Sequence, residues 1–461
     1  MTTLDERNSG IAEQGDDAYA EATQVFNLAA PVEPAAAVTV ESVAAIRAAL
    51  SHAVSNGLSV RVHTTGHASA TFGPMPDSLL IRTRLAGPVV VDSARRVARI
   101  PAGTRWGAVV DALAPHGLAA PHGSAATVGV VGYLLRGGIS FYGRSRGLAV
   151  NSVRAIELVT ADGELRRATA LQDPELFWAL RGGGGGFGIV TALEVDLFPA
   201  TKVITGAAFW PATHAPELLN AWRHWTMSAS PEVSTSLRLL NLPPLPDVPP
   251  VLAGRTMLCI DGVILCTDGD DVTTATRQAD DLLGPLRAIS EPVMDTWQVT
   301  TPGAVLATHM DPSDPVPIQG DHLLLNEIGD DGATELLRLL GEGSHSPLVV
   351  AGLRQLGGAL STPDPTGGCL NHIDAHYIYS GAGIPTDPDA AAAITAHTAK
   401  VRAALTPWNT GRTAPSFVES HTQPQGHLTA EDIEKIDAVR TRIDPSGLFA
   451  ADIMPNCTAR H

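Results

Sequence analysis

Three segments of the chain are unusually rich in glycine, and the first of them contains a histidine. They cover residues 64–73, 127–138 and 182–188, with His67 inside the first. Glycine leaves backbone N–H groups uncovered, so such runs let the main chain approach a large anionic ligand closely. Tight turns between strands would give the same composition in any single segment. A histidine in such a loop is usually a turn residue or a hydrogen-bond donor, so its surroundings decide its role.

The third segment contains a G-x-G-x-x-G pattern formed by Gly183, Gly185 and Gly188. A dinucleotide fingerprint must leave a strand and open a helix, so that a pyrophosphate meets the helix N-terminus. Here a predicted helix over 175–180 precedes the glycines and a predicted strand over 189–197 follows them. The order excludes a Rossmann site. The chain also has no GxxxxGK[ST] sequence, so nothing supports ATP chemistry.

The elements around these segments are short helices and strands. Ser42 is the expected N-cap of a helix over 43–55 that ends at Gly57, and a strand over 58–63 leads into the first glycine segment. The remaining predicted elements are a helix over 106–116 and two strand pairs, 89–91 with 97–100 and 155–160 with 164–168. Strands are not regularly separated by helices, which indicates an α+β rather than a doubly wound arrangement.

The glycine-rich texture ends near residue 199, and this divides the chain. We expect a leader over 1–35 whose first 18 residues are frayed, one domain over 36–200 and a second α/β domain over 201–410. A C-terminal segment over 411–461 completes the chain. A proline-rich interruption lies at 242–252, and no internal repeat is present.

Composition excludes several classes of protein. Lys plus Arg number 31 and Asp plus Glu 48, and the resulting net charge of −17 argues against nucleic acid as a partner. The four cysteines form no CxxC pair and are expected to be buried, reduced thiols. No apolar run is long enough to cross a membrane, and the acidic N-terminus lacks the features of a signal peptide. A cytoplasmic protein is therefore expected.

Taken in order, the three segments resemble the PCMH-type FAD-binding domain of the berberine-bridge-enzyme-like branch of the vanillyl alcohol oxidase family. In that family a strand ends in a loop reading R-x-G-G-H, whose histidine bonds to the 8α-methyl group of the flavin. Here the loop is His63-Thr64-Thr65-Gly66-His67, with His63 in place of arginine and Thr65 in place of one glycine. The resemblance implies FAD tethered through His67.

Other segments are similar to the same family. The second family loop, C-P-T-V-G-x-x-G-x-x-x-G-G, corresponds to 125–138, and its cysteine, which gives many relatives a second flavin link, is Ala125 here. The stretch 173–191 is close to a family signature, and 443–449 looks like the segment that returns to the FAD domain. Residues 353–359 are similar to the substrate-domain sheet that covers the flavin in bacterial members. A single tether is therefore implied.

The resemblance also implies which residues contact FAD. It carries this role to His63, Thr64, Thr65, Gly66, His67, Ala68, Thr127, Val128, Gly129, Gly132, Gly137, Gly138, Leu148, Val153, Gly188, Ile189 and Val190. The implied fold is α+β, with an FAD-binding domain of two α/β subdomains and a substrate domain whose antiparallel sheet covers the flavin.

The implied function is an FAD-dependent oxidase of the bacterial natural-product branch. It would take a hydride from an alcohol, amine or hydroquinone to flavin N5, with molecular oxygen as the acceptor. Two alternatives stay open: a flavin dehydrogenase with another acceptor, and a non-catalytic flavoprotein that binds a drug-like molecule. The substrate and the oligomeric state are not determined by the sequence.

Such chemistry requires a base that removes the substrate proton. The family often uses a tyrosine, but Ser420 stands at that position, so Glu419, His421 and Tyr379 are the candidates. Tyr379 lies at the end of a stretch, 371–379, that reads as a strand. At strand spacing its two faces would carry further candidates, which are His372, His376 and Tyr377. The i, i+4 histidines do not suit a metal on a strand, so no metal is expected.

Overall fold

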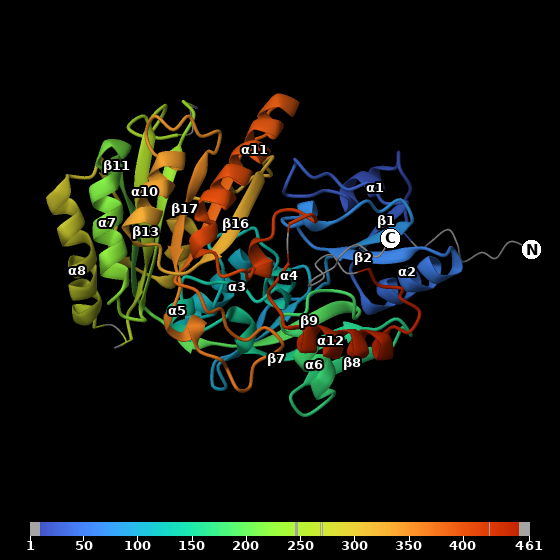
Figure 1. The fold of residues 1–461 in the computed structure, drawn as a ribbon. Coiled ribbons are helices and arrows are strands. Elements are labelled where there is room, and N and C mark those ends of the chain that lie inside the picture. The colour runs from blue at the N-terminus through green and yellow to red at the C-terminus, as the bar shows by residue number, and fades with distance from the viewer. Residues whose placement is uncertain (1–9, 245–247, 268, 270, 424, 451–461) are drawn as a thin grey trace, which may run out of the picture.

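The computed structural model describes residues 10–244, 248–267, 269, 271–423 and 425–450, and it divides into two parts around three larger sheets (Figure 1). The N-terminal part carries a three-stranded and a five-stranded sheet. The second part carries one large sheet of eight strands. Among the described residues, no helix is long and apolar enough to cross a membrane.

The first sheet delivers the first glycine segment. Its parallel strands are ordered β1 (Ala36–Val40), β3 (Ser78–Thr83) and β2 (Ser59–His63). Helix α2 (Val43–Ser55) covers the sheet, and the Ser42 hydroxyl accepts a hydrogen bond from the N–H of Ala45, as predicted. The central strand β3 is almost fully buried and was not predicted, because a buried strand lacks alternation.

The second sheet is antiparallel and confirms both predicted strand pairs. Its order is β4 (Val90–Asp92), β5 (Val97–Pro101), β9 (Ile189–Asp196), β7 (Val153–Val159) and β8 (Leu165–Thr169). The helices of this part are α3 (Trp106–Leu113), α4 (Val130–Leu135), α5 (Gly143–Arg146) and α6 (Pro174–Leu180). β6 (Leu118–Ala119) and β10 (Phe198–Pro199) form a separate, short antiparallel pair. The third glycine segment runs from α6 to β9, the helix-to-strand order that excludes a Rossmann site.

The third sheet has one helix-covered face and one face turned toward the N-terminal part (Figure 1). Its strands follow the order β14 (Met294–Asp295), β11 (Val203–Pro211), β13 (Thr256–Leu265), β12 (Val233–Asn241), β17 (Val350–Gln355), β18 (Tyr377–Gly383) and β16 (Gln319–Leu325), and β15 (Gln298–Thr300) pairs with β11. The covering helices are α7 (Ala215–Thr226), α8 (Thr273–Ile289), α10 (Gly329–Leu340) and α11 (Pro388–Leu405). A short helix, α9 (Val305–Thr308), lies on the other face, against β11 and β13.

The expected strand over 371–379 is wrong in its first two thirds. β18 begins only at Tyr377, and residues 371–376 form an irregular segment held by backbone hydrogen bonds, such as Ile373 N–H to Leu360 O at 2.7 Å. The predicted placement of His372 and His376 on one face of a strand therefore does not hold. The alternating pattern of residue types at 371–376 therefore belongs to a loop and not to a strand.

Both ends of the described chain pack against the first sheet. The expectation of a frayed leader is wrong for residues 10–18, since Ala12 pairs with Ala37 and helix α1 (Asp17–Ala22) begins within them. At the other end, helix α12 (Ala430–Ile443) is followed by a segment that bridges β2, with Val60 N–H bonded to Leu448 O at 2.7 Å. Part of the proline-rich interruption and Cys457 lie outside the described residues.

A buried arginine joins the two parts. Arg144, on α5, donates from Nε to Val233 O at 2.8 Å, from Nη2 to Ala229 O at 2.8 Å, and from Nη1 to Leu356 O. All three carbonyls belong to the second part. Because charge-assisted hydrogen bonds of this kind are among the stronger ones, they fix how the large sheet faces the glycine segments.

Candidate active site

A cavity of about 410 Å³ lies where the glycine segments meet the open face of the large sheet, and we call it the inner cavity. Its volume lies within the range of small-molecule sites. Eleven of the residues expected to contact FAD line it. They are His63, Thr64, Thr65, Gly66, His67, Ala68, Val128, Gly129, Gly132, Gly188 and Val190.

The first glycine segment presents uncovered backbone donors to this cavity. The N–H groups of Thr65, Gly66, His67 and Ala68 make no hydrogen bond to any described residue. At Gly132 a Cβ atom would meet nothing within 4 Å, so its backbone faces open space. Successive free N–H groups form a concave site for an anion. These donors fit the pyrophosphate of a dinucleotide such as FAD.

The third glycine segment is held in place from behind. Arg440, on α12, donates to the carbonyl oxygens of Gly183 at 2.7 Å and Gly185 at 3.2 Å. These bonds hold both carbonyls on the α12 side of the loop, and residues 184–186 line the inner cavity. The returning C-terminal helix therefore shapes a wall of the cavity that the local sequence cannot specify.

The two ring nitrogens of His67 have different surroundings. Its ring stacks on Phe26 with centroids 3.8 Å apart, and its Nε2 lies 3.0 Å from the Thr127 hydroxyl. Nδ1 makes no hydrogen bond to any described residue. Burial lowers the pKa of His67 to about 4, although Asp311 partly opposes this shift. The imidazole is therefore neutral near pH 7, and an Nε2–H donated to Thr127 leaves a lone pair on Nδ1.

Six expected FAD contacts do not line the inner cavity, and five of them pack against neighbouring residues. Leu148, Val153 and Ile189 are buried in the hydrophobic cores, and Ile189 points away from the cavity because its strand neighbour Val190 points toward it. Gly137 and Gly138 have φ of 90° and 69°, where glycine is favoured, and a Cβ would press on neighbouring side chains. The sixth, Thr127, acts through His67.

Glu419 is the candidate base that the structure brings to the inner cavity. His421 is exposed and lies in a neighbouring cleft, and His372 and His376 do not line the cavity either. Tyr379 does not line the cavity: it is 1% exposed and packs between the large sheet and its covering helices. Tyr377 packs in the same core and bonds to Thr226. Tyr377 and Tyr379 are two residues apart on β18, so both side chains point to the helix-covered face of the sheet, away from the cavity.

The surroundings of Glu419 suit proton transfer. Its N–H donates to Gln423 Oε1 at 3.1 Å, while no described residue donates a hydrogen bond to its carboxylate. Burial raises the pKa of Glu419 to about 7, and the Arg136 guanidinium opposes the rise. A base with a pKa near the working pH has the best balance of protonation state and driving force.

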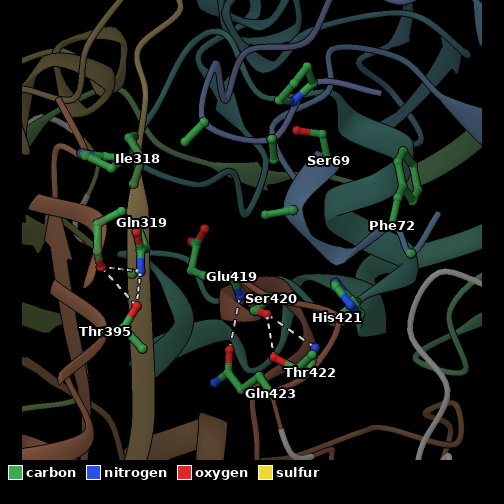
Figure 2. Close-up of a pocket in the computed structure, with 18 of the residues that line it drawn as sticks. Ser69, Phe72, Ile318, Gln319, Thr395, Glu419, Ser420, His421, Thr422 and Gln423 are labelled. Carbon is green, nitrogen blue, oxygen red and sulfur yellow. Dashed lines mark hydrogen bonds between the residues drawn. The ribbon is translucent and has the colours of Figure 1, made fainter. Parts of the chain in front are cut away.

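Glu419 also faces a larger cleft of about 1280 Å³, which we call the outer cleft. Figure 2 shows its side chain between Ile318 and Gln319 on one side and Ser69 on the other. The outer cleft and the inner cavity share four lining residues, which are Ser69, Phe72, Ile318 and Glu419. The inner cavity therefore adjoins a cleft wide enough for the remainder of a larger molecule, and Glu419 stands at the junction.

Several cavity residues were missed by reasoning from the sequence. Phe26, Tyr133, Asp311 and Arg354 line the inner cavity. Of these four, Tyr133 lies in a glycine segment, and the other three lie outside all three segments. Arg354 falls within the stretch likened to the flavin-covering sheet, so that resemblance was the one available signal. His122, which lies shortly before the second glycine segment, is buried, with Nδ1 2.7 Å from Gly123 O.

The placement of Tyr379 gives a first prediction. Its hydroxyl is buried and has no hydrogen-bond partner among the described residues, so Tyr379→Phe removes an unsatisfied group without opening a cavity. We expect flavin reduction rates within about twofold of the parent, because transition-state interactions at the cavity are untouched. The melting temperature should be equal to that of the parent or higher, by at most the amount that corresponds to about 1 kcal/mol of unfolding free energy. A hundredfold loss of rate would contradict the placement of Tyr379 in the core.

Fold and cavity together define a PCMH-type FAD-binding architecture with a substrate domain. Residues 34–169 match the family model described as "FAD binding domain", so the chain carries such a domain. Among solved structures, the wild-type form of a berberine-bridge-enzyme-like protein of Physcomitrella patens superimposes with a TM-score of 0.80 at 19% identity, covering 96% of each chain. A chitooligosaccharide oxidase superimposes with a TM-score of 0.76 at 20% identity, covering 96% of this chain and 97% of the other.

Curated relatives are similar over part of their length. The chain is 31% identical over 223 residues to a xylooligosaccharide oxidase of Thermothelomyces thermophilus, covering 47% of this chain and 45% of that protein. It is 36% identical over 160 residues to (R)-6-hydroxynicotine oxidase of Paenarthrobacter nicotinovorans, covering 34% and 35%. The chain thus matches less than half the length of these relatives. These similarities support the family resemblance.

Proposed function

We propose that this protein is an FAD-dependent oxidase acting on a small molecule. The observation that carries the proposal is that one cavity is lined by the neutral His67 and by Glu419, whose carboxylate accepts no hydrogen bond from any described residue. FAD, when bound, supplies the redox chemistry by accepting a hydride. The protein binds the cofactor and substrate, and removes the substrate proton.

We propose a single covalent tether from His67 Nδ1 to the flavin. The neutral imidazole, its stacking on Phe26 and its bond to Thr127 support this assignment. Ala125 also lines the inner cavity, at the position where relatives carry a second tether, and its methyl group cannot form one. A tether would keep the cofactor in place and raise its potential, which a passive binding protein does not need.

Glu419 is proposed as the proton acceptor. Its carboxylate would take the proton from a substrate O–H or N–H as the hydride leaves. Gln423 holds the Glu419 backbone, so the carboxylate can approach the cavity without moving the chain (Figure 2). This assignment puts the base directly beside the position where the family carries tyrosine, one residue before Ser420.

The substrate is proposed to be natural-product-like, and oxygen is proposed as the acceptor. The names of the relatives include oxidases of a xylooligosaccharide and of a hydroxynicotine, which span sugars and amines. The outer cleft would accommodate the part of such a molecule that does not react. Membership of the bacterial natural-product branch belongs to this proposal as well.

The test is reduction of the flavin by candidate alcohols, amines and hydroquinones without air, followed by admission of oxygen. We expect rapid bleaching of the yellow colour, then its return with release of hydrogen peroxide. Bleaching with slow return in air, but fast return with a quinone, would identify a dehydrogenase. A yellow protein that binds these compounds and is never bleached would identify a binding protein and overturn the proposal.

A further inference from the structure

A buried arginine in the wall of the inner cavity has no carboxylate partner in the described part of the protein. Arg354, on β17, is 7% exposed and lines the cavity. Its Nε donates to Ser236 Oγ at 3.3 Å, and its Nη2 lies 3.5 Å from His309 Nε2. Nη1 donates to no described residue. The guanidinium also lies over the Phe141 ring, 4.4 Å from its centroid.

A chain of polar groups behind Arg354 fixes its orientation. His309 Nδ1 lies 3.0 Å from the Asp261 carboxylate, which is fully buried. Burial would raise the pKa of Asp261, but Arg238 and His309 hold it at about 2. Because an ionised carboxylate accepts the Nδ1–H, His309 Nε2 carries a lone pair and accepts from Arg354. The histidine thus aligns the guanidinium.

The turn that holds His309 is strained. Met310 has a φ of 52°, a left-handed conformation that costs energy for a residue with a side chain. It connects His309 to Asp311, whose carboxylate accepts a hydrogen bond from Ser124 at 2.5 Å. The turn therefore directs the His309 side chain to the sheet and the Asp311 side chain to Ser124, shortly before the second glycine segment. Such strain persists where the surroundings impose it, and functional sites are a common place for it.

The two carboxylates whose charges act on Arg354, Asp261 and Asp311, are bonded to other groups. Asp261 pairs directly with Arg238, and Asp311 accepts a hydrogen bond from Ser124. The carboxylates of the inner cavity, Asp311 and Glu419, form no ion pair with Arg354 among the described residues. A buried guanidinium without an anion is costly, and a planar carboxylate can accept two parallel hydrogen bonds from it.

We infer that Arg354 is a specificity-determining residue that binds a carboxylate of the substrate. This deepens the proposed function and rests on it: the molecule oxidised beside Glu419 carries an acidic group that Arg354 holds. The Asp261–His309 pair positions the arginine and does not touch the substrate. Phe417, which lines the inner cavity beside the guanidinium, favours an apolar or aromatic body next to the carboxylate.

The experiment compares benzoate with its neutral counterpart benzamide as probes of the holoprotein. Binding is followed by calorimetry, and the flavin spectrum is recorded on the same samples. We expect the parent protein to bind benzoate more tightly than benzamide. Arg354→Gln should weaken benzoate binding about tenfold to a hundredfold and leave benzamide binding unchanged. Arg354→Lys, which keeps the charge and loses the fork geometry, should lie between them.

Arg146→Gln is the matched control, because Arg146 also lies over a phenylalanine ring, that of Phe198, but is exposed and outside the cavity. Equal affinities for benzoate and benzamide, or an equal loss of both in Arg354→Gln, would overturn the inference. So would a changed flavin spectrum with unchanged carboxylate preference, which would show that the arginine serves the cofactor. Failure of the proposed function is separate, since it appears as a colourless protein or as flavin that no substrate bleaches.

Discussion

The Glu419→Gln protein is expected to reduce its flavin about 100 to 10,000 times more slowly than the parent, which is the usual loss when a general base is removed. The amide keeps the size of the side chain but cannot accept a proton from substrate. Since Gln423 bonds to the Glu419 backbone rather than to its carboxylate, the local structure should persist. Stopped-flow reduction without air measures the effect directly, with the melting temperature as a check on folding.

The pH dependence separates a base from a residue that only shapes the cavity. Burial raises the pKa of Glu419 to about 7, so the active, ionised form is lost as the pH falls. In the parent, kcat/KM should drop about tenfold for each pH unit below 7 and level off above about pH 8. Glu419→Gln should lose this limb. The exposed Glu434→Gln should retain both the rate and the limb, and an unchanged limb in Glu419→Gln would assign the proton acceptor to another group.

The second large effect concerns the tether. After acid precipitation of the parent, the yellow colour should remain with the pellet, and in His67→Ala all of it should appear in the supernatant. Noncovalent FAD should still bind, because the backbone donors of Thr65 to Ala68 remain. Loss of the ring stacked on Phe26 should cost about 1 kcal/mol, visible as a small decrease in melting temperature.

Two further variants sharpen the assignment to Nδ1. Thr127→Val keeps the imidazole but removes its hydrogen-bond partner, so we expect an incomplete tether with free and bound flavin together. His116→Ala, which removes an exposed histidine, should leave the colour in the pellet. Yellow pellets from His67→Ala would show that another residue carries the link.

Much of the local structure followed from the sequence. Ser42 and the apolar spacing after it predicted α2, and two hairpin-like patterns, the second with its turn at 161–163, predicted both strand pairs of the five-stranded sheet. These features depend on neighbours a few residues apart, where propensity and periodicity act. The order of helix, glycines and strand at 175–197 also excluded a Rossmann site from the sequence alone. His67 was found because its loop is a contiguous motif.

Tertiary structure alone decided which candidate base meets the cavity. Glu419, His421 and Tyr379 were equal in the sequence, and the sheet then buried Tyr379 on its helix-covered face while the chain left His421 in the outer cleft. Arg354 acquired its setting from Asp261 and His309, which lie far away in the sequence. The local sequence determines the type of each residue and its secondary structure. The dielectric environment, the pKa and the partners of a side chain depend on distant segments that pack around it.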